Sequence, residues 1–127
     1  KEGVRNFYAS LIPFGKFFPP DLEMVPVSQT IDQDQLVDEI IFKFTHTTEV
    51  GWMLPNIPPT GKRVEIPLVV IVGFKDGKVT HEHIYWDQAS VLVQIGLLSP
   101  EGLPVNGIET AKRMEEINKT MKSKSVK

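Results

Sequence analysis

The strongest structural constraint in this sequence is the tetrapeptide Lys75-Asp76-Gly77-Lys78, which separates two β-rich runs at residues 64–74 and 78–86. Asp-Gly between two apolar runs predicts a two-residue type I′ hairpin turn, because both residues tolerate the positive φ that this turn requires. Such a turn places Lys75 opposite Lys78 and fixes every later pair. The predicted pairs are His81 with Val72, His83 with Val70, Tyr85 with Leu68, and Asp87 with Ile66.

Side chains on the second strand of the hairpin alternate between the two faces of the sheet. One face carries His81, His83, Tyr85 and Asp87, and the other carries Thr80, Glu82, Ile84 and Trp86. A polar row beside an apolar strand is typical of an apolar pocket with a few polar groups. The face with the histidines is therefore predicted to line a pocket.

Two further strands are predicted upstream. Residues 35–46 form a strong strand whose even positions carry Phe42, Phe44 and His46, and this even face is assigned inward. Asp38 lies on the same face and is either an interior carboxylate or a solvated one at the rim, with the rim favoured. Residues 22–31 are β-rich, but Pro26 restricts them to an edge strand or a bulged strand.

Helices and one long loop complete the predicted elements. Helices are expected at residues 4–12, from Asp87 to near Gly96, and from about Ile108 onward. The apolar stripe expected on the last helix consists of Ile108, Ala111, Met114, Ile117 and Met121. The 48–63 loop carries Trp52, Met53, Leu54 and Ile57, so it is expected to fold over an apolar surface as a lid, a dimer contact or core packing.

Composition excludes several classes of function. The net charge is −2, which provides no field for binding nucleic acid or anionic lipid, and the lysines of residues 119–127 are expected to form a frayed tail. There are no cysteines, so cysteine-nucleophile chemistry and thiolate metal sites are excluded. No apolar run is long enough to span a membrane, and a cytoplasmic protein is expected. The sequence opens on Lys1 inside a predicted helix. Further residues, with room for a targeting signal, are therefore expected upstream.

These elements predict one α+β domain over residues 1–127, with a strongly curved, mostly antiparallel sheet and packed helices. The residues also carry a family pattern. A Pro-Pro-Thr-Gly-Lys loop at residues 58–62 leads into a strand, the Asp-Gly turn, a strand ending in Tyr-x-Asp at 85–87, and a helix with Gln-x-Gly at 94–96. Over about residues 42–98 this pattern resembles the SnoaL-like polyketide cyclases and ester cyclases of the nuclear transport factor two-like superfamily.

The resemblance implies a cone-shaped fold, a cystatin-like roll, that encloses a pocket and commonly forms a homodimer. It also implies that the first helices of the fold, which often contribute pocket residues, are missing from this chain. Asp87 matches the aspartate that acts as acid or base in the cyclases and in limonene epoxide hydrolase. Some relatives are labelled carboxymethylenebutenolidase-like, but that chemistry uses a cysteine nucleophile, which this sequence lacks.

Each candidate residue has a structural alternative. Asp87 is either a catalytic acid or base or the N-cap of the following helix, where it would bond near Ser90. His46 and His83 are the candidates for stabilising a developing oxyanion, although each fits a structural role as well. The predicted substrate-binding residues are Tyr85, Phe42, Phe44, Trp52, Leu54, Leu68 and Val70.

No metal or cofactor is expected, because His81 and Glu82 point to opposite faces and no phosphate-binding loop is present. The leading hypothesis is a cofactor-independent cyclase, isomerase or hydrolase that acts by acid/base chemistry on a small apolar carbonyl, lactone or polyketide-like molecule. The alternative is a non-catalytic domain of the same fold that binds a small ligand or dimerises, or an assembly domain with a solid interior. Neither nucleic acid nor membrane is an expected partner.

Overall fold

The computed structural model describes residues 18–125. The helix predicted at residues 4–12 lies outside the described residues. The elements are β1 (Glu23–Ile31), β2 (Gln35–Thr45), β3 (Arg63–Lys75), β4 (Lys78–Trp86), α2 (Gln88–Gln94) and α3 (Glu109–Ser125).

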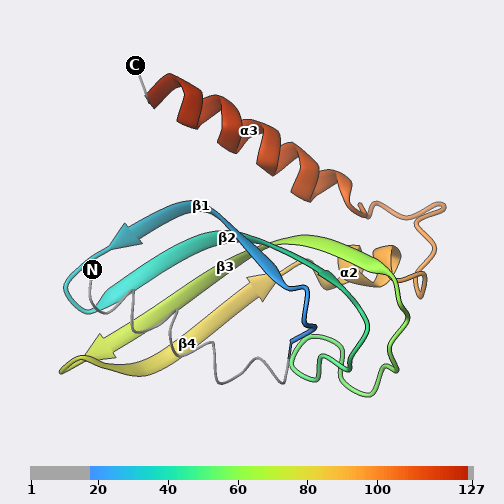
Figure 1. Ribbon diagram of the computed structural model, residues 1–127, viewed down its shortest axis with the longest axis horizontal. Coiled ribbons are helices and arrows are strands. Elements are labelled where there is room, and N and C mark those ends of the chain that lie inside the picture. Colours follow the sequence, from blue (N-terminus) through green and yellow to red (C-terminus); the bar gives the residue numbers. More distant parts are fainter. Residues whose placement is uncertain (1–17, 126–127) are drawn as a thin grey trace.

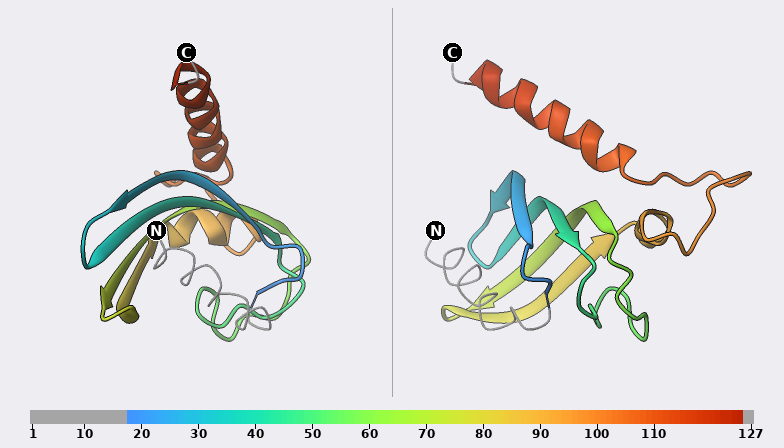
Figure 2. Two further views of the ribbon diagram at one scale, coloured as in Figure 1. Left: turned by 60° about the vertical axis from the view of Figure 1, so that its left-hand side comes forward. Right: turned by 45° about the vertical axis from the view of Figure 1, so that its right-hand side comes forward.

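The strands form one antiparallel, four-stranded sheet in the order β1-β2-β3-β4 (Figure 1). The sheet curves into an arch, with α2 and the loop between β2 and β3 beneath it and α3 above its convex side (Figure 2). The predicted α+β fold with a curved antiparallel sheet is confirmed. Among residues 18–125, no helix has the length and apolar character needed to cross a membrane.

The core lies on the concave side of the sheet. As predicted, the even positions of β2 face inward, where they meet the even positions of β3 and the apolar residues of α2 and the loop. This core contains Leu36, Ile40, Phe42, Phe44, Val50, Met53, Leu54, Val64, Ile66, Leu68, Val70, Val72, Val91 and Ile95. The loop after β2 therefore packs on an apolar surface, as its composition predicted.

Strand β1 is the edge strand that Pro26 predicted. Its register against β2 shifts between Pro26 and Ser28, which is a β-bulge. Proline has no N–H to donate to a ladder, so it fits an edge or a bulge. The Pro26 carbonyl accepts a hydrogen bond of 3.1 Å from the side-chain amide of Asn118 on α3.

The β3–β4 hairpin begins as predicted and then changes register. Asp76 and Gly77 have φ of 53° and 76°, as a type I′ turn requires, and Lys75 faces Lys78. A bulge then leaves Thr80 without a partner, so that Gly73 faces His81 instead of Thr80. The observed pairs beyond the bulge are Val72 with Glu82, Ile71 with His83, Val70 with Ile84, Val69 with Tyr85, and Leu68 with Trp86.

The predicted hairpin register is therefore wrong beyond Val79. A shift of one residue moves every side chain of a strand to the other face. His81, His83 and Tyr85 lie on the outer face, whereas Ile84 and Trp86 pack against the core. The physical reason is burial, because the observed register covers an isoleucine and a tryptophan and leaves the two imidazoles in water.

Helix α3 packs on the convex side with a face that only partly coincides with the predicted stripe. Ala111 and Asn118 are buried, but Ile117 and Met121 of the predicted stripe are 39% and 63% exposed. Lys43 of β2 forms a 2.8 Å ion pair with Glu115 of α3. The helix continues to Ser125, and the flexibility of the tail predicted from residue 119 stays a prediction.

Candidate functional site

Asp87 lies between β4 and α2 and is exposed to solvent. Its Oδ1 accepts a hydrogen bond of 3.2 Å from the backbone N–H of Ser90, so the side chain is the N-cap of α2. An N-cap aspartate satisfies one of the backbone donors that the first turn of a helix leaves unpaired. The structure thus shows the capping contact at Asp87, and its catalytic role stays a prediction.

His46 is fully buried at the end of β2 and joins the two ends of the 48–63 loop. Its Nδ1 accepts a 3.2 Å hydrogen bond from the backbone N–H of Thr60 and lies 3.0 Å from the Thr60 hydroxyl. Because Nδ1 accepts, the proton of the neutral ring is on Nε2, which is buried and has no partner. Burial lowers the pKa of His46, which favours this neutral form.

His83 and Tyr85 do not join His46 or Asp87. Both side chains are exposed on the outer face of β4, and Tyr85 is 60% exposed. The prediction that they line an interior pocket is wrong, because the bulge at Thr80 turns them away from the core.

The other predicted substrate-binding residues pack together on the concave side. Phe42, Phe44, Leu54, Leu68 and Val70 are at most 5% exposed and belong to the core. Trp52 is partly buried in an aromatic cluster, with ring centroids 5.7 Å from Phe18, 6.3 Å from Phe42 and 5.4 Å from Trp86. The tryptophan of the loop is therefore held by edge-to-face contacts, and its indole N–H is buried without a partner.

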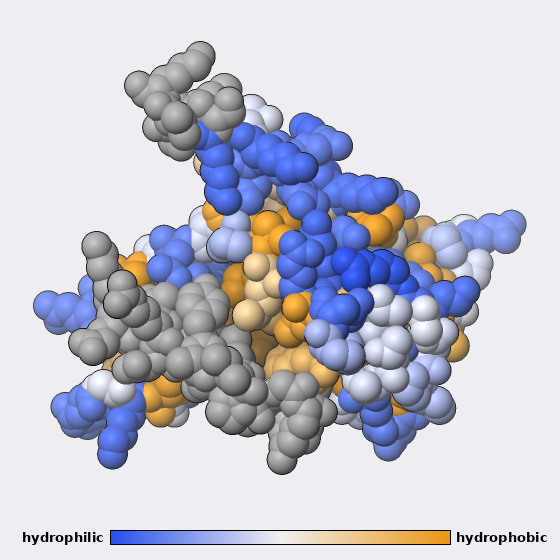
Figure 3. Space-filling model, in the orientation of Figure 1, coloured by the Kyte–Doolittle hydropathy of each residue, from blue (hydrophilic) through white to orange (hydrophobic). Residues whose placement is uncertain are grey.

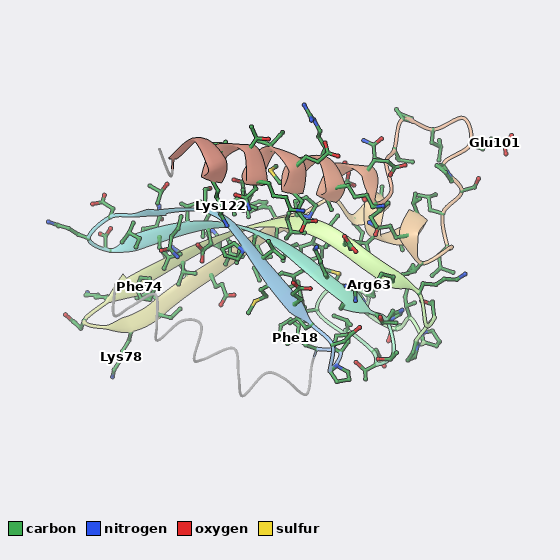
Figure 4. All side chains as sticks on the ribbon, turned by 45° about the horizontal axis from the view of Figure 1, so that its top comes forward. Phe18, Arg63, Phe74, Lys78, Glu101 and Lys122 are labelled. Atoms are coloured by element: carbon green, nitrogen blue, oxygen red, sulfur yellow. The ribbon has the colours of Figure 1, made fainter. Side chains whose placement is uncertain are left out.

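A cavity lies beside this core at the bulged strand β1. Its volume is about 530 Å³, and it is lined by Met24, Pro26, Val27, Ser28, Gln29, Asp38, Ile40 and Lys122. Apolar surface is visible in the hollow below α3 (Figure 3), and Lys122 of α3 lies over the strands at this side of the sheet (Figure 4). An apolar lining with a few polar groups is typical of small-molecule sites.

Asp38 is the buried carboxylate of this cavity. It is 2% exposed, and its Oδ1 accepts a 2.8 Å hydrogen bond from the side-chain amide of Gln29, which faces it across the β1–β2 ladder. The preference for a solvated Asp38 at the rim is therefore wrong. The even face of β2 is interior along its whole length from Leu36 to Phe44, so Asp38 cannot escape the core.

The sequence patterns include Gln94 and Glu82 but do not predict their structural roles. The Gln94 side chain accepts a 2.8 Å hydrogen bond from the backbone N–H of Glu65 and donates one of 3.0 Å to the carbonyl oxygen of Glu65. These two bonds satisfy the backbone of β3 at a position beyond the end of its pairing with β4. Glu82 lies in the inner register of β4, and desolvation raises the pKa of its carboxyl. The signal for Glu82 was that it alternates with Ile84 and Trp86. These two apolar residues mark the face of β4 that turns toward the core, and Glu82 shares that face.

Among residues 18–125, no three or more histidine, aspartate or glutamate side chains lie together in a way that would hold a metal ion. The three predicted catalytic residues therefore lie apart. Asp87 caps α2, His46 is buried beside the 48–63 loop, and His83 is exposed on the outer face of β4. The structure adds a cavity with Asp38 that the sequence did not assign.

The comparisons with known proteins agree on the fold. Solved structures similar to this chain include AclR of Streptomyces galilaeus, a proposed hydroxylase, with 29% identity and a TM-score of 0.55 over 72% of this chain and 59% of AclR. A proposed SnoaL-like polyketide cyclase from Jannaschia sp. CCS1 has 24% identity and a TM-score of 0.55 over 69% of this chain and 60% of that one. TsrD of Streptomyces laurentii has 19% identity and a TM-score of 0.57 over 75% and 67% of the two chains.

This chain thus spans about three-fifths of the length of AclR. No curated protein sequence matches it. The sequence model of the SnoaL-like polyketide cyclases matches residues 2–95, which is most of the chain. The chain therefore belongs to the SnoaL-like polyketide cyclase family.

Proposed function

We propose that this chain is a small-molecule enzyme that moves a proton on a carbonyl-containing substrate in the β1–β2 cavity, with Asp38 as the acid or base. The observation that carries the proposal is a carboxylate only 2% exposed in the wall of a mostly apolar cavity of about 530 Å³. A positioned carboxylate of this kind can act as the general acid or base in cyclisation, isomerisation or hydrolysis of carbonyl, lactone or polyketide-like molecules.

The surroundings of Asp38 suit proton transfer. The Gln29 amide holds one carboxylate oxygen at 2.8 Å and so fixes the orientation of the group. Met24, Pro26 and Ile40 give the cavity its apolar lining next to the carboxylate. Asp38 would take a proton from the carbon next to a carbonyl, the electron pair would pass to the carbonyl oxygen, and the same carboxyl would return the proton to the product.

Lys122 supplies a positive charge at the same cavity. Lys122 is exposed, and its charge would stabilise negative charge that develops on the substrate oxygen at the mouth of the cavity. The family membership and the names of AclR and the Jannaschia protein support small-molecule chemistry of this kind.

The test is deuterium exchange at carbon. The chain is incubated in D₂O with a panel of cyclic ketones and lactones, including 2-tetralone, and deuterium incorporation is followed by mass spectrometry. We expect catalysed exchange with at least one compound and a loss of about 100-fold or more in Asp38→Asn, because general acid–base groups contribute about 10²–10⁴-fold.

Two matched variants make the test specific. Asp32→Asn changes an exposed carboxylate that bonds only to the neighbouring backbone in the described residues, and it should keep full exchange activity. Asp87→Asn separates the two candidate carboxylates. Loss of exchange in Asp87→Asn with full activity in Asp38→Asn would return the catalytic role to Asp87 and reject the present assignment.

A second candidate function is non-catalytic binding of a small apolar ligand. The observation that favours it is that Asp87, which matches the acid or base of the family, is the N-cap of α2 and bonds to the backbone N–H of Ser90. Binding of a ketone from the panel without any exchange, equally tight in the wild type and in Asp38→Asn, would favour this candidate.

A further inference from the structure

His81 and His83 form a pair on the outer face of β4. Their ring centroids are 5.1 Å apart and their planes are inclined by 37°. Both side chains are exposed, because the bulge at Thr80 places them opposite Gly73 and Ile71 on the side of the sheet away from the core. The proposed acid/base chemistry makes no use of this pair.

The spacing of the two rings fits chelation of one metal ion. An imidazole nitrogen binds zinc at about 2.0 Å, and the ring centroid lies about 1.1 Å further along the same line, so two imidazoles at a tetrahedral angle have centroids about 5 Å apart. The observed 5.1 Å is the same separation. Neither ring has to leave the outer face of the strand to share an ion.

His81 is already held in place. Its ring lies against the backbone of Gly73, in space that the Cβ of any other residue would occupy. Its Nδ1 is 3.1 Å from the hydroxyl of Thr80. Metal-binding histidines usually have such a partner on the ring nitrogen that does not bind the metal, which makes Nε2 the candidate donor of His81. Nε2 also lies over Gly73, so an ion would approach it from the solvent side.

We propose that His81 and His83 form a chelating site for a divalent transition-metal ion of the class that prefers imidazole ligands, namely Zn²⁺, Cu²⁺ or Ni²⁺. Only two protein ligands are supplied, and the outer face is open to solvent, so water completes the coordination. The site is independent of the proposed enzyme activity, because it lies on the opposite face of the sheet from Asp38.

The chain has three histidines, so each imidazole can be followed separately by NMR. We expect ZnCl₂ to shift the ring signals of His81 and His83 together, with saturation at one equivalent. His46 is buried behind the loop and serves as the internal reference, since its signals should stay in place. A shift of only one of the two rings, or no saturation at one equivalent, would reject the chelate.

Three variants test the geometry by calorimetric titration with ZnCl₂. His81→Ala and His83→Ala should each lose at least tenfold in affinity, because one ligand is removed. Gly73→Ala keeps both ligands but displaces the His81 ring, and we expect a loss of about tenfold, as for other changes to the support of a metal ligand. Glu82→Gln is the matched control, because Glu82 lies between the two histidines in sequence but on the opposite face of β4.

The Gly73 variant decides between a built site and two independent surface histidines. Equal zinc affinity in Gly73→Ala and the wild type, with both proteins folded by circular dichroism, would show that the position of the His81 ring is irrelevant and would overturn the proposal. An affinity loss in the Glu82→Gln control equal to that of His83→Ala would overturn it as well.

Discussion

His46 shows at the level of a single residue how burial selects a protonation state. Its Nδ1 accepts the Thr60 N–H, its Nε2 carries the proton, and no described charge compensates a second proton. In a protonated ring, Nδ1 could no longer accept the hydrogen bond from the Thr60 N–H, and the ring would be a cation in the core. Burial therefore favours the neutral ring more in the folded state than in the unfolded state.

This gives a prediction for the pH dependence of stability. The folded-state pKa of His46 lies below the ordinary value of 6.5, so the unfolded chain takes up the proton first as the pH falls. Stability from this residue is complete above about pH 6.5 and is lost below it, with a slope of at most about 1.4 kcal/mol per pH unit. Urea unfolding of the wild type and of His46→Gln between pH 8 and pH 5 should show this loss in the wild type alone. Parallel stability curves for the two proteins would contradict the assignment.

Asp38 and Asp87 show that the same residue type is used in two ways. Asp87 is exposed and bonds to a backbone N–H, whereas Asp38 is buried and bonds to a side-chain amide. A local motif predicted the first, because a strand followed by an apolar helix calls for an N-cap. The burial of Asp38 depends on which part of β2 is covered in the folded chain, and no local sequence motif predicts this.

At the level of elements, the bulge of β4 decides which side chains can take part in chemistry. It turns Glu82 toward the concave side and the two histidines away from it. Bulges often re-aim side chains near functional sites. Only one extra residue, Thr80, separates the observed arrangement from the predicted one.

The bulged register can be tested with engineered disulfides, since the chain has no cysteine. Ile71 and His83 face each other on the outer side, so Ile71→Cys with His83→Cys should form a disulfide under mild oxidation. Without the bulge, residue 71 would face residue 82. Ile71→Cys with Glu82→Cys should therefore stay reduced, because their Cβ atoms point to opposite faces. Faster oxidation of the second pair than of the first, measured by thiol titration, would contradict the bulged register and support the unbulged one.

At the scale of the whole molecule, α3 covers the convex side of the sheet through contacts that combine charge and packing. The Lys43–Glu115 pair is only 14% and 24% exposed, and it raises the pKa of Lys43 and lowers that of Glu115. Ala111 is buried nearby in the same helix, at 1% exposure. Small size at this position allows the helix to lie close to the strands.

Replacing Ala111 should therefore loosen α3. Ala111→Glu adds bulk and a buried charge, and overpacking alone costs about 1–3 kcal/mol. We expect faster tryptic cleavage within residues 109–125, with the strand signal in circular dichroism retained. Thr110→Glu changes the exposed neighbour and is the matched control. Identical cleavage of the two variants would show that Ala111 does not hold the helix.

The sequence alone determined the strand positions, the Asp76-Gly77 turn, the edge position of β1, the apolar loop and the family. These follow from patterns within a few residues of each other, such as alternation, proline placement and turn chemistry. The candidate site was predicted less well. The catalytic roles of His46 and Asp87 stay predictions, whereas the burial of Asp38 and the outward direction of His83 differ from what was predicted.

Only the tertiary structure decided the register of β4 and the burial of Asp38. Both registers satisfy the turn, and the choice depends on Trp52, which lies far away in the sequence and packs against Trp86 in only one of them. Likewise, Asp38 is interior because it shares the buried even face of β2 with Leu36, Ile40, Phe42 and Phe44. A local pattern gives each strand its two faces, but the packing partner that arrives from elsewhere in the chain determines which residues share the buried one.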